Sequence, residues 1–165
     1  MRCTNILGTR YSYNNSHKIE TGQPLIIVSN HQSMYDIPAI IWYMRKHHPK
    51  FISKKELGKG IPSVSYNLRH GGSVLIDRKK PIESIKAIED FAKRVDKNNW
   101  AAVIFPEGTR SETGDILRFH KGAMFLSEQL NVDILPLLIH GAGEIIGKND
   151  FIFKESPLTL KYLPR

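Results

Sequence analysis

The sequence has little cysteine and no cluster of residues typical of a metal site. Its one cysteine, Cys3, excludes an internal disulfide and most cysteine-based zinc sites. His47 and His48 are adjacent, so they cannot share a helix face, and no H-E-x-x-H pattern is present. We therefore expect no metal ion, and a reducing, cytoplasm-facing environment.

Long apolar runs are missing as well. The longest contain about six residues, whereas a membrane-spanning helix needs roughly 18–20. The first residues, MRCTNILGTRYSYNN, lack the apolar core of a signal peptide. A G-x-x-x-x-G-K-[ST] loop is also absent, which argues against an ATPase. We expect no transmembrane segment in this chain.

Positive charge is abundant and unevenly distributed. Lysine and arginine total 24 against 16 acidic residues, a net charge of +8. Residues 45–97 hold 14 basic and 6 acidic side chains, a difference of 8 that accounts for the whole excess. Such a segment is either a solvated helix face or the binding surface of an anionic partner. Nucleic acid, an anionic membrane surface and a phosphate-bearing substrate all qualify.

Length and composition predict one folded domain over residues 1–165. Apolar residues make up 41% and charged residues 24% of the chain, which excludes bulk disorder. Apolar runs alternate with segments of helical periodicity, a pattern typical of an α/β fold with a mostly parallel central sheet flanked by helices, with room for an antiparallel edge. The expected strands are 25–29, 51–53, 73–76, 101–105, 134–139 and 158–163. The expected helices are 36–47, 81–98 and 122–131, with a broken helical segment over 55–70.

Three details refine this expectation. The helix over 81–98 has a predicted core stripe of Ile82, Ile85, Ile88, Ala92 and Val95. Residues 11–23 are polar and typical of turns. The proline at position 136 has no N–H to donate, which predicts that its strand lies near a sheet edge or at a bulge.

Polar clusters directly follow three of the expected strands. They are residues 30–36, Asp77 with Arg78, and residues 106–111. In parallel α/β sheets, ligands bind beyond the carboxyl ends of the strands. We therefore expect these loops to meet in one crevice that holds a histidine, several carboxylates and two arginines.

His31 and Asp36 are the first candidates for chemistry in this crevice. Five residues apart on one helix, they would not share a face. They can meet if His31 lies in the turn and Asp36 in the first helical turn. Asp36 would then accept a hydrogen bond from one ring nitrogen and leave the other free as a general base. Alternatively, Asp36 only caps the helix and His31 is a turn residue.

Other side chains in these loops have competing interpretations. Ser33 is not in a G-x-S-x-G elbow, so we expect it to be a helix cap rather than a nucleophile. Arg78 and Arg110 can clamp a phosphate with their planar guanidinium groups, and the turn at Gly108 can add backbone N–H groups. Glu107 would orient an arginine or accept from a substrate hydroxyl, unless it only forms a structural pair with Arg110.

These residues carry a family resemblance. Asn30-His31-(four residues)-Asp36 resembles the histidine–aspartate (HX4D) motif of the glycerolipid acyltransferases, and residues 72–78, Gly-Ser-Val-Leu-Ile-Asp-Arg, resemble their second motif. Residues 105–111, Phe-Pro-Glu-Gly-Thr-Arg-Ser, match the third without change, and residues 135–137 resemble the fourth. Similar stretches occur at 54–57 and 119–122, so the resemblance covers about residues 22–142. The branch with the greatest likeness is that of the 1-acylglycerol-3-phosphate (lysophosphatidic acid) acyltransferases.

The resemblance implies a glycerol-3-phosphate acyltransferase-like fold and a role for each matching residue. His31 is the implied general base, which Asp36 orients. Arg78 and the loop Glu107, Gly108, Thr109 and Arg110 are the implied binding site of the acceptor's glycerol phosphate. The implied acyl donor is acyl-CoA or acyl carrier protein, which is a substrate rather than a cofactor. The segment around the proline at 136 is implied to help form the part of the site that binds this donor.

The implied partners are a lysophospholipid acceptor and an anionic membrane surface, with no nucleic acid. We expect the chain to be peripheral, on the cytoplasmic face of the membrane, in contact through charge and through side chains such as Trp42, Tyr43 and Ile61. Two alternatives stay open. The acceptor can be another lysolipid, such as lyso-ornithine lipid, or the chain can be a basic membrane- or nucleic-acid-binding module without activity.

Overall fold

The computed structural model describes residues 9–14, 19–60, 62–147 and 152–163. Cys3 and Ile61, which entered the sequence analysis, lie outside these ranges. The strands are β1 (Tyr11–Asn14), β2 (Leu25–Ser29), β3 (Lys50–Lys54), β4 (Val74–Ile76), β5 (Ala101–Ile104), β6 (Ile134–His140) and β7 (Leu158–Tyr162). The helices are α2 (Asp36–Tyr43), α3 (Pro62–His70), α4 (Pro81–Asn98), α5 (Gly122–Leu130) and α6 (Ala142–Ile145), with short 3-10 turns η1 (Arg45–His47) and η2 (Lys55–Gly58).

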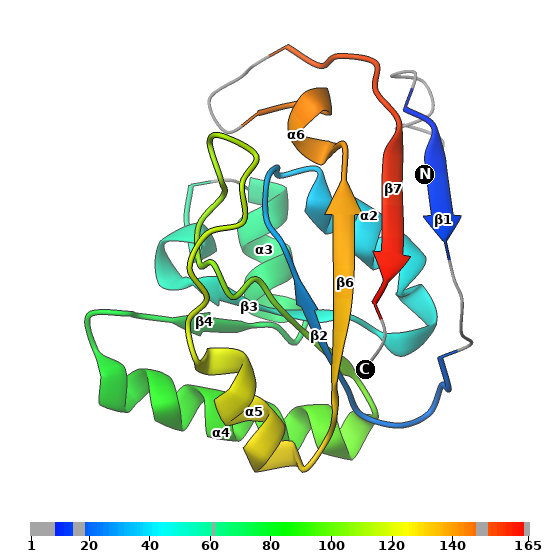
Figure 1. The fold of residues 1–165 in the computed structure, drawn as a ribbon. Helices are drawn as coiled ribbons and strands as arrows, with labels where there is room; N and C mark the ends of the chain where they lie inside the picture. Colours follow the sequence, from blue (N-terminus) through cyan, green and yellow to red (C-terminus); the bar gives the residue numbers. More distant parts are fainter. Residues whose placement is uncertain (1–8, 15–18, 61, 148–151, 164–165) are drawn as a thin grey trace.

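The strands form one seven-stranded sheet in the order β1-β7-β6-β2-β5-β3-β4. The five strands from β6 to β4 are parallel to one another, whereas β7 is antiparallel to β6, and β1 runs with β7. This confirms the predicted α/β class with its mostly parallel sheet and antiparallel edge (Figure 1). The strand β2 lies between β5 and β6, which places the loop after it in the middle of one end of the sheet.

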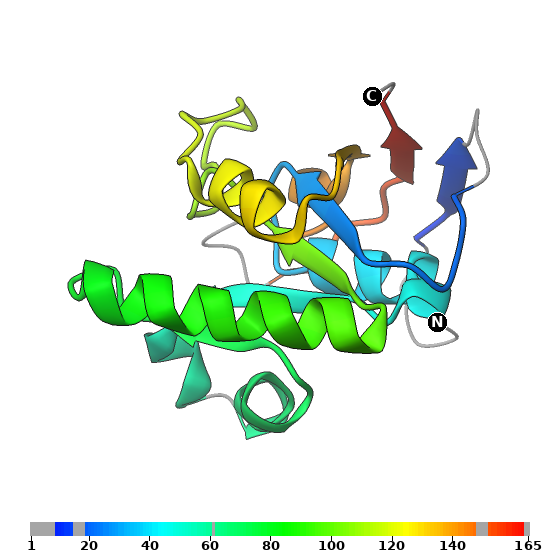
Figure 2. The same cartoon turned by 90° about the horizontal axis from the view of Figure 1, so that it is seen from below.

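Helices cover both faces of the sheet, and each face has its own core. On β2, Leu25 and Ile27 pack into the cluster that includes Ala39 and Ile40 of α2. Ile26 points to the other face, into the cluster that includes Phe91 of α4. Figure 2 shows α4 and α5 beside one another, with α2 on the far side of the strands. Burial on both faces explains why β2 reads as a continuous apolar run.

Four sequence-based expectations about the helices and strands were wrong. Part of the polar segment 11–23 is the strand β1, which is held by pairing with β7 across the register Tyr11↔Leu158. The strand β6 is interior rather than near an edge. It tolerates Pro136 because this residue lies opposite Leu163, where β7 has already ended, and its carbonyl still accepts from the Leu163 N–H at 3.0 Å.

The other two wrong expectations concern the helices α2 and α4. The helix expected over 36–47 stops at Tyr43 and continues as η1, which ends where His48 adopts a left-handed conformation before Pro49. The predicted core stripe of α4 is buried only in part. Ile88, Ala92 and Val95 are buried, but Ile82 and Ile85 are 82% and 46% exposed. The first turns of α4 therefore extend beyond the surface that the sheet and α5 can cover.

Candidate active site

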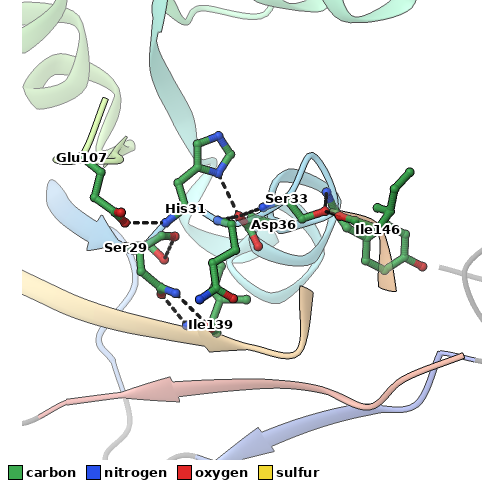
Figure 3. A network of polar contacts seen from close by, with 10 residues as sticks. Ser29, His31, Ser33, Asp36, Glu107, Ile139 and Ile146 are labelled. Atoms are coloured by element: carbon green, nitrogen blue, oxygen red, sulfur yellow. Dashed lines mark hydrogen bonds and ion pairs between the residues drawn. The ribbon is translucent and has the colours of Figure 1, made fainter. Parts of the chain in front are cut away.

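His31 and Asp36 meet at the carboxyl end of β2. The Nδ1 atom of His31 lies 2.8 Å from Oδ2 of Asp36 (Figure 3). As the sequence analysis required, His31 precedes α2 and Asp36 is the first residue of that helix. No described residue binds the other ring nitrogen, Nε2, and the His31 side chain is 15% exposed. The imidazole is therefore oriented by one nitrogen and accessible at the other.

The Asp36 carboxylate also fixes the turn before the helix. Its side chain is 1% exposed, and Oδ2 accepts from the backbone N–H groups of Gln32 at 2.9 Å and Ser33 at 3.0 Å. Its second oxygen, Oδ1, is buried without a hydrogen-bond partner among the described residues. The same oxygen that holds the imidazole thus closes the turn that carries it, so Asp36 both folds the local backbone and orients the ring.

The His31 backbone is anchored from two further elements. Asn30 donates from Nδ2 to the carbonyl of Ile139 and accepts at Oδ1 from the N–H of the same residue, both at 2.8 Å, which ties the loop to β6. The carbonyl of His31 accepts from the Ser111 N–H at 2.9 Å. The imidazole stacks on Phe105 with ring centroids 4.0 Å apart. The sequence analysis gave Asn30 and Phe105 no role, although both lie inside the motifs it singled out.

Glu107 has a different position from the one expected. Its side chain is buried, Oε1 accepts from the His31 N–H at 2.8 Å, and Oε2 accepts from the Leu117 N–H at 2.9 Å. Within the described residues it forms no ion pair with Arg78 or Arg110. Both carboxylate oxygens are used by backbone donors, so Glu107 connects the loop after β2 to the loop after β5. It does not orient an arginine.

The two arginines reach the same end of the sheet from different strands. Arg78 follows β4, and its guanidinium group lies against Gly108, where a Cβ atom would come 2.7 Å from Nη1. Gly108 has a φ of +68°, a backbone conformation that favours glycine, and a larger residue there would also displace the Arg78 guanidinium. Arg110 is half-buried, and its neighbour Ser111 binds the His31 carbonyl. Both guanidinium groups are free of ion pairs with the described residues. Thr109 is half-buried in the same loop.

Ser33 is a buried residue that holds the loop before α2 in place through hydrogen bonds. It is fully buried, its Oγ donates to the Ile146 carbonyl at 2.7 Å, and the Tyr35 N–H donates to it at 3.1 Å. The N-cap of α2 is Tyr35, which has no side-chain cap, so the expectation that Ser33 caps this helix was wrong. Its burial and its bond to the segment after α6 make it part of the framework. The three predicted loops therefore do converge, with a histidine base candidate and two uncompensated arginines on one side.

In the described part of the chain, no group of three or more His, Cys, Asp or Glu side chains is placed to hold a metal ion. The fold and site together define a parallel α/β domain with a histidine–aspartate pair at the carboxyl ends of its strands. Residues 10–140 match the family model described as Acyltransferase, and the chain belongs to that family.

Within this family, the chain is similar to several proteins of one named activity. A 1-acyl-sn-glycerol-3-phosphate acyltransferase from Cocos nucifera is 34% identical over 83% of this chain and 44% of its own length. The beta form from Homo sapiens is 28% identical over 94% of this chain and 55% of its own. The chain thus spans about half the length of these relatives. A crystal structure of the 1-acyl-sn-glycerophosphate (LPA) acyltransferase PlsC from Thermotoga maritima superposes with a TM-score of 0.81 at 30% identity, over 98% of this chain and 63% of that one.

Proposed function

We propose that this chain transfers a fatty acyl group from a thioester donor to the free hydroxyl of 1-acylglycerol-3-phosphate, which yields phosphatidic acid. The observation that carries the proposal is the His31–Asp36 pair at 2.8 Å with Nε2 accessible. The relatives named 1-acyl-sn-glycerol-3-phosphate acyltransferase support this acceptor. The donor is acyl-CoA or acyl carrier protein, and no further cofactor takes part.

In this mechanism, Nε2 of His31 removes the proton of the acceptor hydroxyl as its oxygen attacks the thioester carbonyl carbon. Asp36, bound at Nδ1, keeps the imidazole in the required tautomer and stabilises the imidazolium that forms. The carbon–sulfur bond then breaks, and the leaving thiolate takes the proton from Nε2. No acyl-enzyme is formed, consistent with the burial of Ser33.

The acceptor's phosphate binds to Arg78 and Arg110. Two guanidinium groups that form no ion pair with a described residue, beside a glycine turn, suit a dianionic phosphate because each can bind it with two N–H donors. In the same proposal the chain works as a peripheral protein on the cytoplasmic face of a membrane, where its lipid acceptor lies. No helix among the described residues is long and apolar enough to span a bilayer.

The test is thiol release from a long-chain acyl-CoA by the purified chain in detergent. It is run with lysophosphatidic acid, with lyso-ornithine lipid, without acceptor, and with acyl carrier protein as the alternative donor carrier. We expect release that needs lysophosphatidic acid and that falls about 100- to 10,000-fold in His31→Ala. His70→Ala, an exposed histidine at the end of α3, is the matched control and should keep full activity. Thiol release with only lyso-ornithine lipid would show that this lipid, not lysophosphatidic acid, is the acceptor. Near-normal turnover of His31→Ala would refute the assignment of His31 as the general base.

A further inference from the structure

Five large apolar side chains are exposed on the segments that follow β4 and β5. They are Ile82 (82% exposed) and Ile85 (46%) on α4, Ile116 (61%) and Phe119 (53%) in the loop after β5, and Met124 (60%) on α5. We call these five residues the ledge. Figures 1 and 2 both place the start of α4 and the loop into α5 on the same side of the molecule. Because parallel strands end at one edge of the sheet, the ledge lies at the same end as His31.

The ledge includes the exposed end of the apolar stripe on α4. Ile82 and Ile85 continue the stripe of Ile88, which is buried, so the apolar face of α4 runs on past the core into solvent. Isolated surface apolar residues are ordinary, but several together on adjoining segments are typical of an interaction surface.

Basic side chains accompany the ledge. Exposed lysines or arginines stand at positions 79, 86, 118 and 121, and none of the four forms an ion pair with a described residue. Lys80 is paired with Glu83 at 2.7 Å. Over residues 77–86 and 112–124 the chain has six basic and four acidic side chains, a net charge of +2. Apolar side chains flanked by cations fit an anionic lipid surface, where the apolar groups enter the acyl boundary and the cations meet headgroup phosphates.

The geometry points to the ledge as the surface that docks on an anionic bilayer, and this inference rests on the proposed function. Arg78 stands directly before the segment that opens α4, and Gly108, which its guanidinium group touches, belongs to the loop that leads to Phe119. A lysolipid can therefore keep its chain in the bilayer while its phosphate reaches the arginines.

The side chains expected to contact the membrane are placed less well for this purpose. Tyr43 is packed between Tyr13 and Tyr162, with ring centroids 4.4 and 5.3 Å away. Trp42 is 41% exposed, but the Arg45 guanidinium covers its ring at 4.7 Å. Trp42 lies near the far end of α2 from Asp36, about 9 Å along the helix axis.

The experiment compares two double variants in vesicle sedimentation. Ile82→Ser with Ile85→Ser alters the ledge, and Ile41→Ser with Trp42→Ser alters two adjacent apolar residues on α2 that are 44% and 41% exposed. The probes are vesicles of phosphatidylcholine alone and of phosphatidylcholine with an equimolar amount of phosphatidylglycerol. We expect the ledge variant to bind the anionic vesicles about tenfold or more weakly, the α2 variant to bind like the wild type, and salt to weaken binding of both. Equal losses in the two variants, or no loss in the ledge variant, would overturn the proposal.

Two further measurements separate docking from catalysis. Both double variants should retain wild-type turnover of a short-chain acceptor dispersed below its micelle concentration, because the substituted side chains are exposed and outside the site. His31→Ala should sediment like the wild type. If no acceptor is acylated, the proposed function is wrong, but vesicle sedimentation still measures whether the ledge binds the membrane. If the ledge variant loses turnover only with acyl carrier protein as donor and keeps vesicle binding, an acidic protein occupies the ledge and the membrane proposal is wrong.

Discussion

Replacing Glu107 with glutamine distinguishes two possible roles of this residue: holding the loop that carries His31, or contacting the substrate. The carboxylate is 4% exposed and accepts one backbone hydrogen bond at each oxygen, from His31 and from Leu117. Glutamine is nearly isosteric but has one oxygen and one NH2 group. In either orientation of the amide, an N–H donor of the side chain faces a buried backbone N–H, so one of the two loops loses its attachment.

The size of the effect follows from these contacts. Loss of one charge-assisted hydrogen bond, with a buried N–H left unpaired, lowers the free energy of unfolding by about 2–4 kcal/mol. For a chain of this length, that change lowers the Tm by about 5–15 °C. In the folded fraction, release of the His31 N–H displaces the imidazole, and a displacement of about 1 Å reduces kcat about 100-fold.

The assay combines thermal unfolding with steady-state kinetics below the Tm of the variant. We expect a lower Tm, a lower kcat and an acceptor KM within about twofold of wild type, since the arginines keep their positions. Glu128→Gln, an exposed glutamate on α5, is the matched control and should change neither quantity. A variant with normal Tm and kcat but a strongly raised acceptor KM would refute the first role and restore the substrate contact expected from the sequence.

Two other predictions concern a binding residue and a buried histidine. Arg110→Ala should raise the acceptor KM about 10- to 100-fold with little change in the donor KM, and equal changes in both would contradict the phosphate clamp. His47 is buried, and burial first, then the charges of His48 and Lys46, lower its pKa below the usual 6.5. The folded state keeps it neutral while the unfolded state binds a proton, so this contribution to stability is present above pH 6.5 and is lost as the pH falls below it. Urea titrations at neutral and acidic pH should therefore show a smaller loss of stability for His47→Phe than for the wild type, and parallel losses would show that His47 does not titrate in this way.

Much of the fold and of the candidate site could be predicted because both depend on patterns of residues close together in the sequence. The strand β2 is a buried apolar run, and α4 begins at a proline and follows a helical period. The spacing of His31 and Asp36 allowed their contact if His31 lay in the turn, although the sequence left open that Asp36 only caps the helix. Polar loops after parallel strands had to converge, because the carboxyl ends of those strands share one edge of the sheet.

The features that escaped prediction depend on partners far away in the sequence. Glu107 binds backbone N–H groups, which every residue except proline offers, so the side-chain pattern contains no sign of that pairing. The strand β1 exists because β7 lies beside it. Ile82 continues a regular apolar stripe, and only the size of the covering surface decides that it is exposed. Similarly, Pro136 is compatible with an interior strand because the neighbouring strand ends beside it.

The two hydrogen bonds between Asn30 and Ile139 have a consequence for folding during synthesis. They join the loop that carries His31 to a strand that is synthesised 109 residues later. A ribosome that has finished β2, β5 and the loop after β5 has made both His31 and Glu107, yet β6 is still missing from its place beside β2. The nascent chain therefore holds the histidine without this anchor until β6 has been synthesised and has paired with β2.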